Sequence, residues 1–253
     1  MEKRPFLIDT HCHADAYFSL GEVISDVEKS RVHVIAVTNT PAAFQRMSLR
    51  IGRSELMRVA VGIHPLEAHS AGNSVLMAFE LALGITDYVG EIGLDFSPQG
   101  TATRTAQLGV FERICDALKR RPRVATVHTR GAAKHALRSL RESGVGPVVL
   151  HWFVSIKDLD DALADGHYFS FNSSMCNSAK GRDMLLRIPS DRILTETDGP
   201  YAKTLGRVSY PSDIPSICKS IAKSWNCDPS NAEAKVASNF ARLKKLFAVA
   251  ADS

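Results

Sequence analysis

The sequence has no paired-cysteine motif. Its five cysteines are an odd number, are widely scattered and form no Cys-x-x-Cys pair. A disulfide framework needs cysteines in pairs, and a thiolate zinc site needs them closely spaced. The sequence therefore predicts neither kind of site, and we expect the protein to work in the reducing cytoplasm.

Long apolar runs and a strong net charge are also absent. No run approaches the ~18 apolar residues of a membrane span, and the first residues lack the apolar segment of a signal peptide. We therefore expect no membrane association. The 31 Lys and Arg residues against 27 Asp and Glu residues give a net charge of +4. This mild charge is compatible with an anionic substrate, but it does not by itself argue for nucleic acid.

The chain shows no low-complexity linker, no repeat and no domain boundary, so we predict one domain over residues 1–253. Apolar runs of strand length alternate with helical patterns throughout. The expected strands are Phe6–Thr10, Val32–Thr38, Arg58–Ile63, Tyr88–Leu94, Val124–Val127, Val148–Leu150, His167–Phe171 and Ile193–Thr197. Runs that are apolar throughout suit a parallel sheet buried on both faces, and the alternation implies βαβ units. With a length near ~250 residues, the pattern predicts an α/β fold, a (β/α)8 TIM barrel.

Helices are expected between these strands, and two more in the tail, at residues 214–225 and 232–247. The stretch Ala202–Asp213 is expected to be a long surface loop. It follows the last strand, on the face where barrel enzymes carry their active sites.

Metal-type ligands lie in or beside five of the expected strands, the first, fourth, fifth, sixth and eighth. They are His11, His13, Glu91, His128, His151 and Asp198. Taken singly, each has an ordinary explanation, such as a hydrogen-bonded core histidine, a structural salt bridge or a helix cap. Their joint placement near the carboxyl ends of strands is different, because those ends converge at one mouth of a barrel. The pattern predicts a site for two divalent metals and a metal-dependent hydrolase.

Several ordered segments resemble the TatD family of metal-dependent hydrolases, within the amidohydrolase superfamily. The segments are Ile8–His13, Val61–Pro65, Gly90–Asp95, Val127–Arg130, Glu196–Tyr201 and Asn239–Leu243. The chain departs from commoner members at Gly131, Trp152 and Gly199. With Val37–Pro41 and His151–Phe153, these departures are similar to the TatD-like component of Qat anti-phage defence systems. Other defence proteins would then be partners.

The resemblance implies two metal sites that share one carboxylate: His11, His13 and Asp198 at the first, His128 and His151 at the second, and Glu91 between them. A water between the metals would be the nucleophile. Asp198 would accept its proton and later help to protonate the leaving group, so Asp198 and Glu91 are assigned catalytic roles. The metal could be zinc, magnesium or manganese.

Four further residues are candidates for contact with a substrate. Arg130 could share the face of His128 and bind a phosphate, or could open a helix at the surface. Trp152 could stack on a nucleobase or pack between barrel and helices. His64 ends the third strand and could line the site. Glu196 could face the same mouth and hold an outer ligand or a further metal.

Three functions follow from these observations. The resemblance implies a phosphodiesterase, a nuclease acting on DNA or RNA ends, with nucleic acid or a nucleotide as its substrate. A small-molecule amidohydrolase or deaminase acting on a C–N bond would use the same metals. A defence-complex subunit would act mainly through its partners, and a large exposed apolar patch would then be expected.

Overall fold

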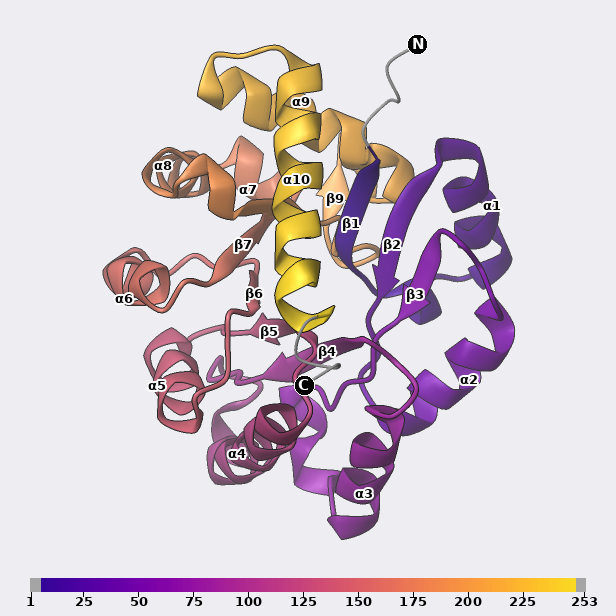
Figure 1. Ribbon diagram of the computed structural model, residues 1–253, viewed down its shortest axis with the longest axis vertical. Helices are drawn as coiled ribbons and strands as arrows, with labels where there is room; N and C mark the ends of the chain where they lie inside the picture. Colours follow the sequence, from indigo (N-terminus) through magenta and orange to yellow (C-terminus); the bar gives the residue numbers. More distant parts are fainter. Residues whose placement is uncertain (1–5, 249–253) are drawn as a thin grey trace.

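Eight parallel strands form the centre of the molecule in the computed structural model, which describes residues 6–248 (Figure 1). They are β1 (Leu7–Cys12), β2 (Val32–Ala36), β3 (Met57–Val59), β4 (Tyr88–Gly93), β5 (Val124–His128), β6 (Val149–His151), β7 (Tyr168–Phe171) and β8 (Ile193–Thr195). The predicted TIM-barrel fold is confirmed. Each expected strand lies within a few residues of its predicted bounds, although the third is shorter than expected.

The strands form two ladders, β1-β2-β3 and β4 through β8, and short contacts close the barrel between them. At one seam, an isolated parallel bridge joins Val61 to Val89. At the other, the Thr10 hydroxyl donates to the Thr195 carbonyl over 2.9 Å. The barrel is therefore closed by individual hydrogen bonds at two places rather than by one continuous ladder.

Helices surround the barrel on the outside (Figure 1). They are α1 (Leu20–Ser30), α2 (Pro41–Ile51), α3 (Asn73–Ala82), α4 (Arg104–Arg120), α5 (Ala133–Ser143), α6 (Leu159–Ala164), α7 (Ser173–Asn177), α8 (Ala179–Arg187), α9 (Ile214–Trp225) and α10 (Pro229–Ala248). None of the helices in residues 6–248 has the length and apolar character needed to cross a membrane.

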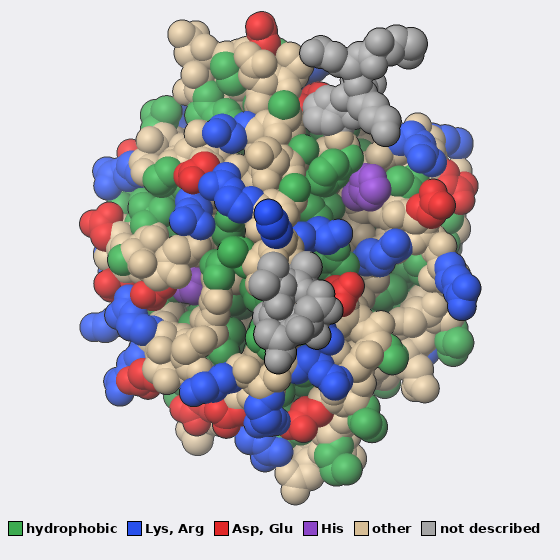
Figure 2. Space-filling model, viewed as in Figure 1, with side chains coloured by type: hydrophobic (Ala, Val, Ile, Leu, Met, Phe, Trp, Pro, Cys, Tyr) green, Lys and Arg blue, Asp and Glu red, His purple; other side chains and the backbone are tan. Residues whose placement is uncertain are grey.

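The last helix, α10, runs across the amino-terminal ends of the strands (Figure 1). Its Val236, Phe240 and Leu243 pack against barrel side chains such as Ile8 and Leu194. Lys and Arg side chains are spread over this face (Figure 2). Because α10 covers this end, the opposite end, at the carboxyl ends of the strands, is the one left for a site.

Two local features were not predicted. The five-residue helix α7 is too short to show a period in the sequence, and its cap is a hydrogen bond from the Met175 N–H to the Asn172 side chain. The stretch expected as a loop contains a hairpin, β9 (Lys203–Thr204) and β10 (Arg207–Val208). Its turn has positive φ at both Leu205 and Gly206, as a two-residue hairpin turn of type I′ requires.

Candidate metal centre

The six predicted ligands converge at the carboxyl ends of the strands. β1 carries His11 and leads directly to His13, β4 carries Glu91, β5 and β6 end at His128 and His151, and Asp198 follows β8 by three residues. All are buried except His128, which is partly exposed. The barrel brings them together because parallel strands end at the same mouth.

The two carboxylate oxygens of Glu91 face different histidines. Oε1 lies 2.5 Å from His128 Nδ1 and 3.8 Å from His151 Nε2. Oε2 lies 3.7 Å from His11 Nε2 and 3.2 Å from His13 Nε2. One carboxylate therefore stands between two pairs of imidazoles, which is the arrangement that a bridging ligand requires.

On the Oε2 side, the carboxylate of Asp198 completes the group. Its Oδ1 lies 3.8 Å from His11 Nε2 and 3.6 Å from His13 Nε2. The two Nε2 atoms are only 3.1 Å apart. Facing lone pairs at this distance repel each other, so either a shared proton or a cation is needed between them.

Hydrogen bonds at the far side of each ring decide which nitrogen faces the cluster. His151 Nδ1 lies 2.9 Å from a carboxylate oxygen of Glu196, which leaves Nε2 facing inward. His128 Nε2 lies 3.0 Å from Asp95, which leaves Nδ1 facing Glu91. Such carboxylate–imidazole pairs are the usual support of a metal ligand, since they fix the tautomer and the ring orientation.

The position of Glu196 differs from the one expected. Its side chain is fully buried, and Oε2 also accepts a hydrogen bond from the Ser170 hydroxyl. Oε1 accepts from Asn172 Nδ2 over 3.0 Å. Both oxygens are occupied beneath the cluster, so the side chain suits orienting His151 and not contact with a substrate.

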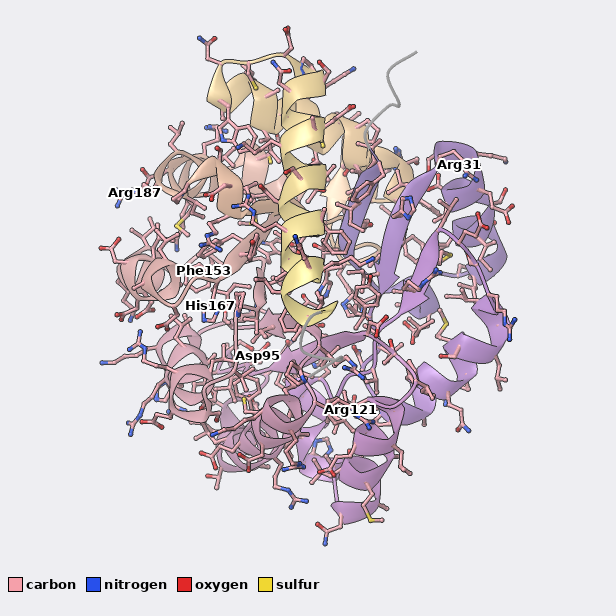
Figure 3. All side chains as sticks on the ribbon, in the orientation of Figure 1. Arg31, Asp95, Arg121, Phe153, His167 and Arg187 are labelled. Carbon is pink, nitrogen blue, oxygen red and sulfur yellow. The ribbon has the colours of Figure 1, made fainter. Side chains whose placement is uncertain are left out.

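Asp95 has the equivalent place beneath His128, and sequence reasoning quoted it only as part of a motif. Its Oδ1 accepts from the Ser97 N–H over 2.8 Å, and its own N–H donates to Gln107 Oε1 over 2.8 Å. The side chain, labelled in Figure 3, is almost completely buried. A carboxylate soon after the Glu91 strand was the only sequence signal for this role.

A second carboxylate that sequence reasoning did not assign is Asp9, two residues before His11. It is fully buried and accepts the N–H groups of His11 over 3.2 Å and Thr197 over 2.9 Å, together with the Thr197 hydroxyl. The Asp198 N–H donates to the His11 carbonyl over 2.9 Å. Asp9 therefore ties β1 to the segment after β8 and fixes His11 and Asp198 relative to each other.

His64 lies beside the cluster but differs from the other imidazoles. Its Nδ1 accepts a hydrogen bond from the Leu66 N–H over 3.1 Å, and its Nε2 lies 3.5 Å from Glu91 Oε2. Burial lowers the pKa of this imidazole to about 4, so the ring is neutral near pH 7. A neutral ring whose Nδ1 accepts must carry its proton on Nε2. His64 therefore presents an N–H donor to the site rather than a metal ligand.

Burial and close charges shift the pKa values of the cluster apart. Burial raises the pKa of Asp198 to about 7. Burial acts to lower the pKa of His151, but the charges of Glu196, Asp198 and Glu91 raise it to about 10. Burial and the charge of His151 lower the pKa of His11 well below its usual range. Strong, opposing shifts of this kind mark functional sites.

The rim of the site carries the remaining candidates. Arg130 is exposed and forms no ion pair within residues 6–248. Trp152 is half-buried, with its ring centroid 6.3 Å from that of His151. Tyr201, which sequence reasoning did not single out, is 62% exposed, and its ring centroid lies 4.9 Å from that of His13. The expected tryptophan and the tyrosine therefore lie against histidines of the cluster, and Arg130 is exposed two residues after His128.

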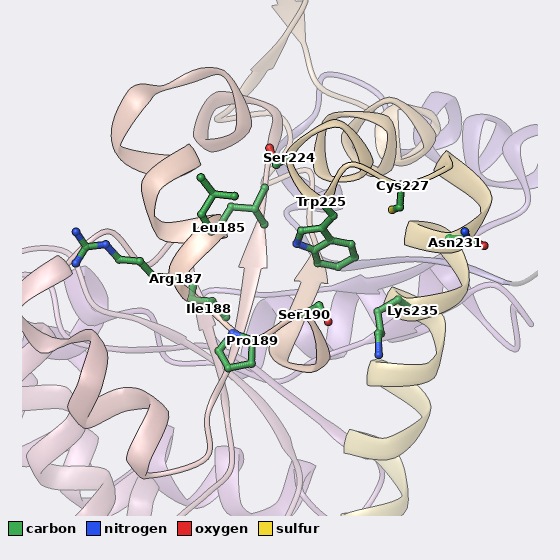
Figure 4. Close-up of a pocket in the computed structure, with 11 residues that line it drawn as sticks. Leu185, Arg187, Ile188, Pro189, Ser190, Ser224, Trp225, Cys227, Asn231 and Lys235 are labelled. Carbon is green, nitrogen blue, oxygen red and sulfur yellow. The ribbon is translucent and has the colours of Figure 1, made fainter.

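An open groove lies elsewhere on the molecule. It has a volume of about 600 Å³ and runs between α8, the end of α9 and the start of α10 (Figure 4). Leu185, Pro189, Trp225 and Lys235 are among its lining residues. None of the three clusters of potential metal ligands found in residues 6–248 lies in this groove. Its size therefore does not make it the candidate active site.

The donor set at the barrel mouth fits divalent cations. Three groups of side chains each bring their ligand atoms within 4.8 Å of one another: His11, His13 and Asp198; His11, Glu91 and His151; His64, Glu91 and His128. Neutral imidazoles with carboxylates suit zinc, manganese and similar ions. The hydrogen bond to Leu66 removes His64 from the third group, which leaves the six predicted residues as the candidate ligands.

Comparisons with known proteins agree with this geometry. The family model described as TatD related DNase matches residues 8–245. An Escherichia coli K12 protein, YcfH, described as an uncharacterized metal-dependent hydrolase, is 28% identical over 94% of this chain and 95% of its own length. The 3'-5' ssDNA/RNA exonuclease TatD of Edwardsiella piscicida is 29% identical over 83% of this chain and 85% of its own length.

Among solved structures, the TatD homologue YjjV from Escherichia coli K12 superposes with a TM-score of 0.83. The superposed part covers 92% of this chain and 95% of the YjjV chain, at 21% sequence identity. At this identity the likeness supports the barrel fold alone.

Proposed function

The chain belongs to the TatD-related DNase family of metal-dependent hydrolases, and from this premise we propose that it is a phosphodiesterase that cleaves nucleic-acid ends. The observation that carries the proposal is the position of Glu91, whose two oxygens face two separate pairs of imidazoles. That arrangement suits a pair of divalent cations, which typically lie about 3.5–4 Å apart in hydrolases of phosphate esters.

Six residues would hold the cations, as the sequence pattern implied. His11, His13 and Asp198 would bind on one side, His128 through Nδ1 and His151 through Nε2 on the other, and Glu91 between them. When bound, such cations lower the pKa of a water and polarise the phosphoryl group that it attacks. Asp95 and Glu196 would hold the two imidazoles of the second side in place.

The residues of the chain supply the remaining steps. Asp198 would take the proton of the attacking water and return it to the leaving oxygen. The Asp198 carboxylate lies in the segment that follows β8. Its Oδ1 is 3.8 Å, 3.6 Å and 4.0 Å from the Nε2 atoms of His11, His13 and His151. His64 would donate its Nε2–H to a phosphoryl oxygen, and Arg130 would bind a neighbouring phosphate at the rim.

Hydrolysis of a C–N bond in a small molecule is the competing function, because the same ligands serve amidohydrolases. The relative named as an exonuclease supports nucleic acid, as do the exposed arginine and the aromatic side chains at the rim. A small-molecule hydrolase would be expected to enclose its substrate in a closed pocket.

The test uses protein freed of metal with EDTA and reloaded with Mg²⁺ or Mn²⁺. We expect reloaded protein to degrade short single-stranded DNA and metal-free protein to leave it intact. Glu91→Ala should abolish cleavage, while Glu80→Ala, which removes an exposed carboxylate paired with Arg120 on the outer helices, should not. Intact DNA with fully loaded wild-type protein would refute the nuclease proposal. Cleavage of a dihydropyrimidine or acylated amino sugar by that same protein would favour the C–N hydrolase.

A role in anti-phage defence, with further defence proteins as partners, rests only on the sequence resemblance at Val37–Pro41, Gly131, His151–Phe153 and Gly199. Challenging cells that carry the gene and its neighbours with phage tests this role. Protection that is lost with Glu91→Ala would support it, and equal phage growth with and without the genes would refute it.

A further inference from the structure

We propose that Trp152 and Tyr201 are stacking surfaces for nucleobases beside the cluster. The inference rests on the proposed nuclease function and specifies which side chains hold the bases of its substrate. It goes beyond the metal ligands, because neither aromatic side chain belongs to that group.

The two rings lie against two different histidines of the cluster. Tyr201 meets His13 with ring centroids 4.9 Å apart and planes at 77°. Trp152 meets His151 with centroids 6.3 Å apart and planes at 87°. Both histidines approach the same oxygen of Asp198, His13 within 3.6 Å and His151 within 4.0 Å. The aromatic side chains therefore flank the point where the scissile phosphate would lie.

Neither ring is stacked face to face on another aromatic ring in the described part of the chain, because both contacts are T-shaped. Tyr201 is 62% exposed, which leaves a large aromatic side chain in water. The indole N–H of Trp152 has no hydrogen-bond partner among residues 6–248. It is not one of the buried unpaired polar atoms, so it is exposed to solvent. A base stacked on these rings would remove aromatic surface from water.

The backbone at Trp152 supports a functional role for the indole. Its φ of 41° is a left-handed conformation that is unfavourable for a bulky side chain. Glycine or asparagine would adopt it at lower cost, and strain of this kind concentrates at binding and catalytic sites.

An exposed arginine close in sequence to the cluster supports a nucleic-acid strand as the occupant. Arg130 is exposed and without an ion pair in the described residues, two positions after His128. It can bind a phosphate of the strand whose bases stack on the rings. Bases within a duplex are covered on both faces by their neighbours, so stacking on protein side chains requires single-stranded or splayed nucleotides.

Fluorescence tests Trp152 directly, because the chain has only two tryptophans. The other, Trp225, lines the groove between α8, α9 and α10 (Figure 4). Metal-free Trp225→Phe protein, titrated with a single-stranded oligothymidylate, should show saturable quenching of its emission. Trp152→Phe protein should bind the same labelled oligonucleotide, by anisotropy, without a change in emission. Binding by Trp225→Phe protein with unchanged emission would overturn the proposal for Trp152.

Kinetics test both rings. We expect Tyr201→Ala and Trp152→Asn to raise KM for single-stranded DNA, and asparagine tolerates the left-handed backbone at position 152. The rise should be roughly fivefold to a little over a hundredfold, which corresponds to the ~1–3 kcal/mol lost with one stacked base. Tyr201→Phe should keep wild-type kinetics, because it keeps the ring. Wild-type protein should cleave single-stranded ends at least tenfold faster than blunt duplex ends. Unchanged KM in both ring-removing variants, or equal rates on the two ends, would overturn the inference. Failure of the nuclease proposal looks different, because wild-type protein would then cleave neither end.

Discussion

Replacing Glu196 by glutamine should weaken metal binding although Glu196 touches no metal. Its Oε2 accepts from His151 Nδ1 over 2.9 Å and from the Ser170 hydroxyl, and its Oε1 accepts from Asn172 Nδ2 over 3.0 Å. Glutamine has one amide oxygen, so its NH2 group must face a donor in either orientation. If the NH2 group faces His151, Nδ1 of the imidazole has to accept its hydrogen bond. The ring proton then moves to Nε2, which is the nitrogen needed for the metal.

The opposite orientation sets the NH2 group against the amide of Asn172. That amide cannot turn over freely, because its oxygen already accepts from the Met175 N–H over 3.0 Å. A buried donor left without a partner costs ~1–3 kcal/mol. Loss of such an outer partner typically lowers metal affinity 10–100-fold, about 1.4–2.8 kcal/mol at ~1.4 kcal/mol per tenfold. The two routes to the magnitude agree, and we expect the metal dissociation constant to rise by that factor.

Competition between the protein and a fluorescent chelator, with Zn²⁺ or Mn²⁺ as titrant, measures this change. Hydrolysis should also recover in Glu196→Gln protein as the metal concentration is raised. The matched control is Glu80→Gln, the same substitution at an exposed ion pair, which should bind metal as wild type does. A folded Glu196→Gln protein with wild-type metal affinity would refute the support of His151 by Glu196.

Three further predictions follow from the structure. Burial lowers the pKa of His167 from 6.5 to about 4, so the folded protein binds fewer protons than the unfolded chain between these values. The free energy of unfolding should therefore fall by up to ~3 kcal/mol as pH drops from about 6.5 to 4, and His167→Asn should flatten this dependence in denaturant titrations; equal pH profiles would contradict it. A Cβ on Gly62 would lie 2.2 Å from a backbone oxygen, so Gly62→Ala should lower the free energy of unfolding by ~3 kcal/mol or more. Gly109→Ala, on open helix surface, should raise it by ~0.5–1 kcal/mol, and similar melting temperatures for the two variants would contradict the packing argument. Against the effect of burial, neighbouring carboxylates raise the pKa of His128 to about 9 and that of His151 to about 10. Both rings must lose a proton to bind metal, so metal binding at neutral pH should release on the order of two protons, measured by calorimetry in buffers of different ionisation enthalpy; a buffer-independent heat would exclude this.

Local sequence signals were enough for the elements with strong periodicity. The helix at residues 214–225 lies where it was predicted, because it has a buried apolar stripe several turns long. The short helix α7 and the hairpin β9–β10 were missed. A segment of two to five residues carries too few positions for a period, and its structure depends on turns and caps.

The positions of the metal-type ligands could also be predicted, but their surroundings could not. Strand order places His11, Glu91 and His151 at one mouth as soon as the barrel is assumed. The roles of Asp95 and Glu196 depend on which ring nitrogen each one meets. Side-chain orientation of that kind arises only when separate strands have packed against each other.

The sequence by itself determined which strands carry ligand-type side chains and in what order, because the chain fixes each residue's place along its own strand. Only the tertiary structure decided which histidines each Glu91 oxygen faces and which ring nitrogen of His64 carries the proton. It also decided how Asp9 joins β1 to the segment after β8. These contacts join residues far apart in the chain, as in the 188 positions between Asp9 and Thr197. No local pattern encodes such distances, because they are set by the closure of the barrel.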